Sequence, residues 1–148
     1  KDVKIKDILD ESMKNIEALC DLKDVCINIY GDENIKINCD FKWQVEAVTN
    51  ILKNCVEHSN TNSSINVYCE KNKIYSQIKI QDFGVGIDEE DLPHIFERFY
   101  KGKNASSNSI GIGLALAKSI IEKNDGYIEV DSQINKGSTF KIKYFNKI

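Results

Sequence analysis

Apolar residues recur at every second position in two separate stretches of the chain, residues 65–80 and 128–144. They are Ile65, Val67, Cys69, Ile74, Ile78 and Ile80 in the first stretch, and Ile128, Val130, Phe140, Ile142 and Tyr144 in the second. Because successive side chains of a strand point to opposite faces, both stretches predict strands with one apolar and one polar face. Such strands fit a mostly antiparallel sheet that is wet on one side and covered by helices on the other.

Three segments have the apolar spacing of amphipathic helices: residues 5–20, the segment that follows Asp40, and residues 112–123. Asp40 is an expected N-cap for the second of these. Two short alternating runs, 25–29 and 35–39, flank the turn-forming sequence at 31–34 and predict a further hairpin. The expected fold is an α/β two-layer sandwich, with a mixed, mostly antiparallel sheet and three helices on one face.

The second helix also carries a polar face of an unusual kind. Asn50, Asn54, Glu57 and His58 fall at positions i, i+4, i+7 and i+8, so they lie close together on one side. A solvated helix face is normally rich in Lys and Glu, whereas this one is rich in amides. The pattern indicates a functional surface.

Three glycine motifs follow in order, at Asp82-Phe83-Gly84-Val85-Gly86, Gly111-Ile112-Gly113-Leu114 and Gly137-Ser138-Thr139. Taken singly, the first and third fit ordinary tight turns, and the second fits a helix start. The functional alternative is close approach of a ligand to the backbone, with the first N–H groups of a helix facing an anion. The long stretch from Asp82 to Ile110 fits no regular element, which in a compact domain favours a functional loop.

The order and spacing of these motifs resemble those of the ATP-binding catalytic domain of bacterial sensor histidine kinases. Asn50-x3-Asn54, Asp82-x-Gly84-x-Gly86, Phe96-x-x-Phe99 and Gly111-x-Gly113 match its N, G1, F and G2 boxes. The resemblance covers roughly residues 5–145 and implies the Bergerat ATP-binding fold, also found in gyrase and a heat-shock chaperone. It implies one catalytic domain over residues 1–148, with an ATP lid at about 88–111.

The resemblance also implies roles for individual residues. Asp82 is expected to accept a hydrogen bond from the adenine amine, with Thr139 supporting that end and His58 packing near the base. Asn54 is expected to coordinate Mg²⁺, and Asn50 to lie beside the phosphates or the metal. The remaining expected ATP contacts are Gly84, Gly86 and Ile87 around the base, Lys101 from the lid, and Gly111, Gly113 and Leu114 at the phosphates.

Two positions depart from the family pattern. Glu57 stands where the family commonly has Lys, and we expect it to act as a catalytic base or metal neighbour; the alternative is an idle solvated side chain. Asn50 stands where hydrolytic relatives have Glu, and an amide cannot activate water as a base. This favours phosphoryl transfer over ATP hydrolysis.

Composition bounds the remaining expectations. The chain has 148 residues, enough for one domain, with a net charge of −3 and no basic stripe, so a nucleic-acid partner is not expected. The five cysteines have no paired C-x-x-C spacing, which favours free, buried thiols over disulfides or zinc. No apolar stretch has the length of a membrane span or the pattern of a signal peptide, so a cytoplasmic location is expected.

The only two histidines are His58 and His94, and neither has the helical-hairpin context that a phosphate-accepting histidine needs. We therefore expect the acceptor on a separate dimerisation domain of the same parent protein, with a response regulator downstream. The parent is expected to be a membrane-bound homodimer and this domain a monomer. The alternatives are a serine kinase of the anti-sigma type and a nucleotide-binding pseudokinase that docks a partner.

Overall fold

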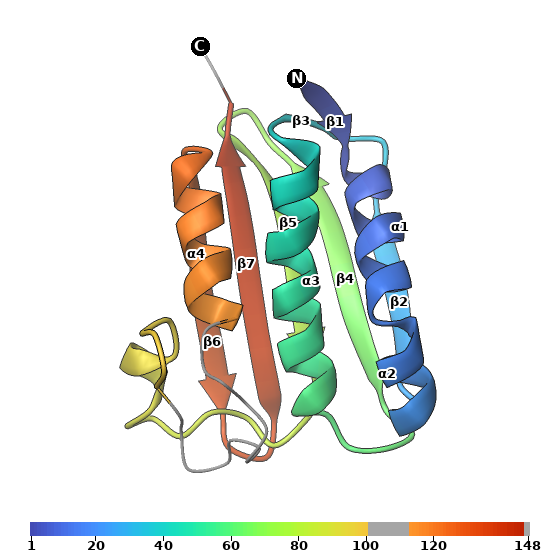
Figure 1. The fold of residues 1–148 in the computed structure, drawn as a ribbon, viewed down its shortest axis with the longest axis vertical. Helices are drawn as coiled ribbons and strands as arrows, with labels where there is room; N and C mark the ends of the chain where they lie inside the picture. The colour runs from blue at the N-terminus through green and yellow to red at the C-terminus, as the bar shows by residue number, and fades with distance from the viewer. Residues whose placement is uncertain (101–112, 147–148) are drawn as a thin grey trace.

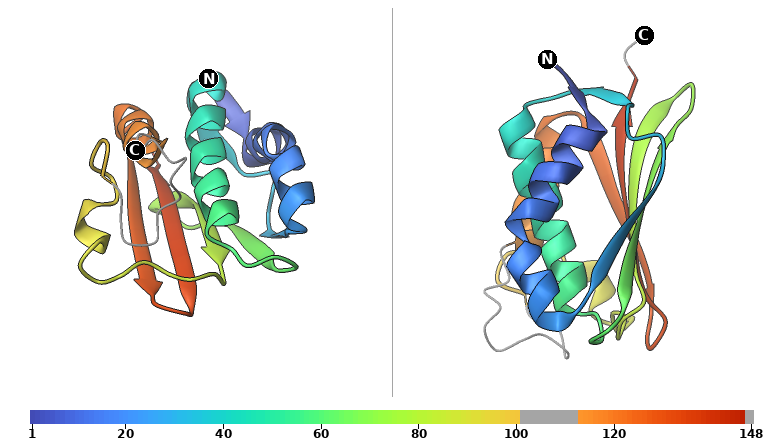
Figure 2. Two further views of the ribbon diagram at one scale, coloured as in Figure 1. Left: turned by 60° about the horizontal axis from the view of Figure 1, so that its bottom comes forward. Right: turned by 90° about the vertical axis from the view of Figure 1, so that its right-hand side faces the viewer.

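The computed structural model describes residues 1–100 and 113–146. Its helices form one layer and its main sheet a second layer behind them (Figures 1 and 2). The helices are α1 (Ile5–Asn15), α2 (Glu17–Lys23), α3 (Phe41–Glu57) and α4 (Gly113–Lys123), with a short 3₁₀ helix, η1, at Leu92–His94. The strands are β1 (Asp2–Lys4), β2 (Cys26–Gly31), β3 (Lys36–Asn38), β4 (Ser64–Lys71), β5 (Tyr75–Asp82), β6 (Gly126–Gln133) and β7 (Gly137–Phe145).

The main sheet has the strand order β2-β4-β5-β7-β6. All neighbouring pairs are antiparallel except β2 and β4, which are parallel. Ile80 pairs with both Val67 and Phe140, and all three side chains are buried on the face that the helices cover. The predicted apolar positions of the strands form the core, except Ile74, which precedes β5 and is 65% exposed. The predicted mixed, mostly antiparallel two-layer sandwich is confirmed.

The predicted first helix is in fact two helices, so four α-helices rather than three cover the sheet in the described residues. The break lies at Ile16, whose backbone leaves the helical region with φ −113° and ψ 10°. Ile16 is itself buried in the core, whereas α2 buries none of its residues completely. The break thus lets the chain keep Ile16 inside while α2 turns along the surface.

The predicted hairpin over residues 25–39 is wrong. The turn forms, with Asn34 N donating to Asp32 Oδ1 at 2.9 Å, but β2 pairs with β4 and β3 pairs with β1. The carbonyl groups of Glu33 and Ile35 instead accept the first N–H groups of α1, from Lys6 and Ile5, both at 2.9 Å. Those N–H groups have no partner within their own helix, so the segment satisfies them and cannot fold back on β2.

Helix α3 runs through the middle of the helical layer, between α1 and α4 (Figure 1). Asp40 caps it as predicted, since Asp40 Oδ1 accepts from Trp43 N at 3.2 Å. Its far end lies beside the end of β5 and the turn between β6 and β7, at the bottom of Figure 1. This is where the polar face of α3 meets the glycine motifs.

Candidate functional site

Asp82 is the last residue of β5, and its side chain is only 2% exposed. Its Oδ1 accepts hydrogen bonds from Gly84 N at 3.0 Å and from Ser138 N at 3.2 Å. The Cys55 thiol, fully buried on α3, donates a further hydrogen bond to this carboxylate. The strand end and two flanking segments therefore fix the carboxylate in one orientation.

Burial raises the pKa of the Asp82 carboxyl above its ordinary value of 3.8, because removal from water disfavours the charged form. The hydrogen bonds from Gly84, Ser138 and Cys55 oppose this rise, and so does the nearby His58. In turn, burial and the neighbouring carboxylate raise the pKa of the Cys55 thiol well above 9. The site thus holds a desolvated acceptor that gains from any additional donor.

Three glycines bring three segments of backbone into contact around this carboxylate. A Cβ on Gly84 would collide with the His58 carbonyl oxygen at the end of α3. A Cβ on Gly86 would collide with the Gln133 carbonyl, and one on Gly137 with the Asp82 carbonyl. We call this meeting of 58–59, 82–87 and 132–138 the three-segment junction. Only residues without a side chain permit so close an approach.

Hydrogen bonds join the same segments. Val85 N donates to the His58 carbonyl at 3.2 Å, and Asn135 N donates to the Val85 carbonyl at 2.8 Å. Ile87 N donates to Ser132 Oγ at 2.7 Å, and Ser132 Oγ lies 2.8 Å from Ser138 Oγ. The predicted contact residues Gly84, Gly86 and Ile87 therefore belong to a loop that is bonded along its length to α3 and to the β6–β7 turn.

The structure places Ser138, rather than Thr139, beside Asp82. Thr139 pairs with Gln81, and it alternates with the buried Ser138 and Phe140. Its side chain therefore points to the open face of the sheet, opposite to the Asp82 carboxylate. The three residues that sequence reasoning missed are Ser138, Ser132 and Cys55. Ser138 could have been identified from the sequence. It lies two and four residues before the apolar residues Phe140 and Ile142, so its side chain is on their face of the strand.

The polar face of α3 lies next to this junction. Asn50, Asn54 and His58 are half-buried, whereas Glu57 is exposed. Among the described residues, neither the Asn50 nor the Asn54 side chain has a hydrogen-bond partner. In the part of the chain that the structure describes, two half-buried amides are therefore available to a ligand.

Helix α4 begins beside the same face. A Cβ on Gly113, its first residue, would lie 3.8 Å from Cγ and Oδ1 of Asn50, so the two helices meet there (Figure 1). The N–H groups of the first turn of a helix have no partner within the helix and carry partial positive charge. Leu114 packs its side chain against the core, which leaves its backbone to contribute to this end. The predicted contacts Lys101 and Gly111 lie outside the described residues.

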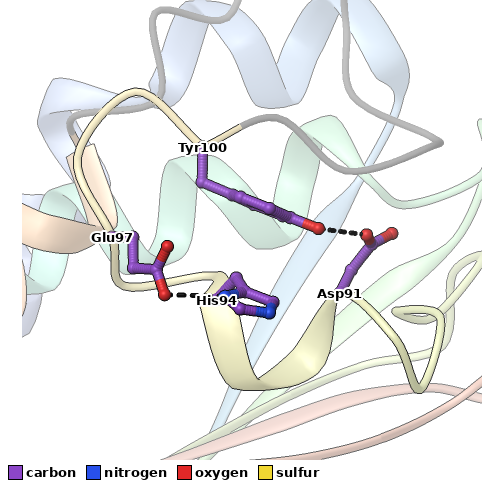
Figure 3. Close-up of polar contacts among 4 residues, drawn as sticks. All are labelled: Asp91, His94, Glu97 and Tyr100. Atoms are coloured by element: carbon purple, nitrogen blue, oxygen red, sulfur yellow. Dashed lines mark hydrogen bonds and ion pairs between the residues drawn. The ribbon is translucent and has the colours of Figure 1, made fainter.

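The first part of the predicted lid is held by a cluster of four side chains, Asp91, His94, Glu97 and Tyr100 (Figure 3). Tyr100 Oη donates to Asp91 Oδ1 at 2.5 Å, and the His94 ring stacks on the Tyr100 ring with centroids 5.1 Å apart. His94 Nδ1 lies 2.7 Å from Glu97 Oε2. Of the predicted lid at 88–111, the structure describes residues 88–100, and these contacts fold that part into a compact turn.

Comparison with known proteins gives matches over most of the chain. The family described as histidine kinase-, DNA gyrase B- and HSP90-like ATPase matches residues 40–147. The sensor histidine kinase YvrG of Bacillus subtilis is 35% identical over 115 residues, which are 76% of this chain and 20% of YvrG. The heme sensor protein HssS of Staphylococcus saprophyticus is 33% identical over 143 residues, 97% of this chain and 31% of HssS. The chain thus spans between a fifth and a third of these relatives.

Solved structures share the fold. The mycobacterial sensor histidine kinase MprB superposes with a TM-score of 0.86 at 23% identity, over 98% of this chain and 97% of that one. The catalytic domain of the histidine kinase ThkA superposes with a TM-score of 0.85 at 19% identity, over 98% and 94% of the two chains.

Within residues 1–100 and 113–146, no helix is both long enough and apolar enough to cross a membrane.

Proposed function

Because the chain belongs to the family of histidine kinase-, DNA gyrase B- and HSP90-like ATPases, we propose that it binds Mg·ATP and transfers the γ-phosphate to a histidine. Within that family it is an ATP-binding catalytic domain of the histidine kinase type. The acceptor histidine lies on a separate dimerisation domain of the same parent protein. The observation that carries the proposal is the buried Asp82 carboxylate. It is fixed where α3, the loop at residues 83–87 (the G1 loop) and the β6–β7 turn meet.

Asp82 suits the recognition of an adenine amine. Its carboxylate is an acceptor only, and both backbone donors bind Oδ1. A desolvated carboxylate gains most from a new hydrogen bond, because hydrogen bonds to charged groups are worth about 1.5–3 kcal/mol. Gly84, Gly86 and Ile87 form the adjoining wall, and His58 supplies a ring at the end of α3.

The phosphates belong at the other end of the same face. The backbone N–H groups of Gly113 and Leu114 open α4, where the helix dipole favours an anion. Asn50 lies against Gly113, and Asn54 follows one turn later on α3. Lys101 and Gly111 are proposed to complete the phosphate contacts.

Asn54 is the proposed protein ligand of Mg²⁺. Mg²⁺ takes oxygen ligands and commonly keeps several waters while bound to substrate phosphates, so one or two side-chain oxygens suffice. The amides of Asn50 and Asn54, which have no hydrogen-bond partner within residues 1–100 and 113–146, fit this requirement. When bound, the ion neutralises charge on the phosphates and orients them.

Transfer is favoured over hydrolysis by the residues on α3. The Asn50 amide cannot take a proton from water, and it occupies the place beside the α4 N-terminus. Glu57 is exposed on the same helix, where its carboxylate is free to meet an incoming acceptor imidazole. We propose Glu57 as the base for that proton.

The remaining partners follow from this reaction. A response regulator would receive the phosphate from the acceptor histidine. The parent protein is proposed to be a membrane-held homodimer that keeps this domain, monomeric by itself, in the cytoplasm.

The test is phosphotransfer between separate parts. The domain is incubated with Mg²⁺ and γ-labelled ATP, together with the dimerisation domain of the parent protein. We expect acid-labile label on the dimerisation domain, and loss of that label when its acceptor histidine is replaced. Binding of ATP without any transfer would instead favour a docking pseudokinase, and acid-stable label on a serine would favour a serine kinase.

A further inference from the structure

Lys23, the last residue of α2, reaches the C-terminal end of α3. Its Nζ donates to the carbonyl groups of Val56 at 3.0 Å, Glu57 at 2.9 Å and Ser59 at 2.7 Å. An ammonium group has three N–H donors, so these three acceptors satisfy all of them. The last carbonyls of a helix have no partner within the helix and carry partial negative charge, so a cation here stabilises them.

The main chain of Lys23 holds the same region. Its carbonyl group accepts a hydrogen bond from Asn62 N at 3.2 Å, in the loop that leads from α3 to β4. Figure 1 shows that α2 and α3 end side by side at the same end of the helical layer. The side chain and backbone of one residue therefore fix both the end of α3 and the start of the next loop.

This end of α3 carries the ligand-facing residues. His58 is the C-cap, between the capped carbonyls of Glu57 and Ser59. The His58 carbonyl accepts a hydrogen bond from Val85 N. It also lies so close to Gly84, two residues after Asp82, that a Cβ on Gly84 would collide with it. A shift of the last turn of α3 would therefore move the loop that holds the Asp82 carboxylate.

We propose that Lys23 is a positioning residue for the nucleotide site, acting through the end of α3 on the G1 loop. All three acceptors of its side chain are main-chain oxygens. The ammonium group therefore fixes the backbone conformation at the end of α3 and does not neutralise a neighbouring carboxylate. Lys23 has no contact with the ligand in this scheme. The inference rests on the proposed function only in taking Mg·ATP as the ligand of the junction.

The test compares Lys23→Met, Lys23→Gln and the control Lys14→Met, an exposed lysine in the last turn of α1. Mg·ATP affinity is measured by calorimetry at a temperature where thermal unfolding shows each variant to be folded. We expect Lys23→Met to weaken binding by about fivefold or more, Lys23→Gln by a smaller factor, and Lys14→Met by less than about twofold. If Lys23→Met does not fold, Lys23→Gln serves in its place.

A second readout needs no nucleotide. We expect the amide resonances of Gly84 and Val85 to shift in Lys23→Met and not in Lys14→Met. A lower melting temperature with unchanged affinity and unchanged Gly84 and Val85 resonances would reduce Lys23 to a stabilising cap and overturn the proposal. Failure of the parental domain to bind Mg·ATP would count against the proposed function, whereas the resonances would still decide the role of Lys23.

Discussion

At the scale of single residues, Asp82 is the residue of the candidate site whose burial costs folding free energy. Ionising a carboxylate with 2% exposure carries a desolvation penalty, and this penalty raises its pKa. An acid whose pKa is raised in the folded state stabilises the fold fully only below its ordinary value of 3.8. That stabilisation is lost as the pH rises through the raised pKa. The charged form of Asp82 is therefore the less stable one for the fold, and we propose that ligand binding is the reason for its presence.

We predict that Asp82→Asn is more stable than the parental domain at pH 7 and binds ATP less well. Asn keeps an oxygen that can accept from Gly84 and Ser138 but removes the buried charge. The melting temperature should rise by about 2–4 °C, equivalent to roughly 1 kcal/mol for a domain of this size. ATP affinity should fall by about tenfold or more, as expected for a lost hydrogen bond to a charged acceptor. Thermal unfolding and calorimetry measure the two effects.

The pH dependence of this stability difference tests whether the buried charge of Asp82 causes it. The difference in melting temperature between Asp82→Asn and the parental domain should shrink as the pH falls toward 3.8. Asp131→Asn, a change at a side chain with 79% relative exposure, is the control and should change neither stability nor affinity appreciably. A lower melting temperature for Asp82→Asn at pH 7 would mean that the ionised form is the one that the fold prefers.

Glu57→Gln tests the proposed base. Because Glu57 is exposed and its carboxylate has no partner among the described residues, its loss should leave folding and ATP affinity almost unchanged, the latter within about threefold. The rate of phosphorylating a separately supplied dimerisation domain should fall by about tenfold or more. Glu46→Gln is a matched control, since Glu46 is exposed on the same side of α3 three turns earlier. Transfer at the parental rate by Glu57→Gln would return this residue to the solvated surface.

At the scale of elements, the three-segment junction explains why glycines stand at 84, 86 and 137. Each permits backbone contact with a different segment, so the motifs that look like separate turns form one structure. The sequence could identify the motifs and their order. It could not show that the β6–β7 turn packs against the G1 loop, because 45 residues separate Ile87 from Ser132 and no local pattern links them.

Gly86→Ala should therefore damage the fold, whereas Gly113→Ala should not. Gly86 has φ +75°, and an added Cβ would collide with the Gln133 carbonyl, so we expect a loss of about 2–4 kcal/mol of unfolding free energy. At Gly113 an added Cβ meets Asn50 at an ordinary 3.8 Å, and stability should change by about 1 kcal/mol or less. Urea unfolding of both variants makes the comparison. Equal losses would show that close contact at the junction is not what requires glycine at 86.

Long strands and helices were predicted well because their apolar periodicity reflects burial on one face. The antiparallel pairs β4–β5 and β6–β7 were expected, and so was the Asp40 cap of α3. Short segments were predicted poorly, since β3 has three residues and its partner is set by the contacts of β1 and α1. Lys23 had no signal in the sequence, because a side chain that caps a distant helix leaves no local pattern.

In the whole molecule, the proposed nucleotide site lies far from the N-terminus. The β6–β7 turn and the end of α3 are at the bottom of Figure 1, whereas residue 1 and the end of β7 are at the top. Helix α3 alone spans roughly 25 Å at 1.5 Å per residue. In the proposed reaction, an acceptor histidine would have to approach the end of this layer that lies opposite residue 1.

The domain by itself should therefore not label either of its own histidines from γ-labelled ATP. His58 is the half-buried C-cap of α3, and its carbonyl accepts a hydrogen bond from Val85 N. His94 lies in a three-residue 3₁₀ helix, with Nδ1 against Glu97 and its ring stacked on Tyr100. Phosphoryl transfer requires the attacking and leaving atoms to lie in line, and neither histidine lies in the helical hairpin that is expected to present an acceptor. The measurement is acid-labile label on the domain with Mg·ATP, set against the same reaction with the dimerisation domain added. Label on the domain alone that disappears in His58→Gln or His94→Gln would show that it carries its own acceptor.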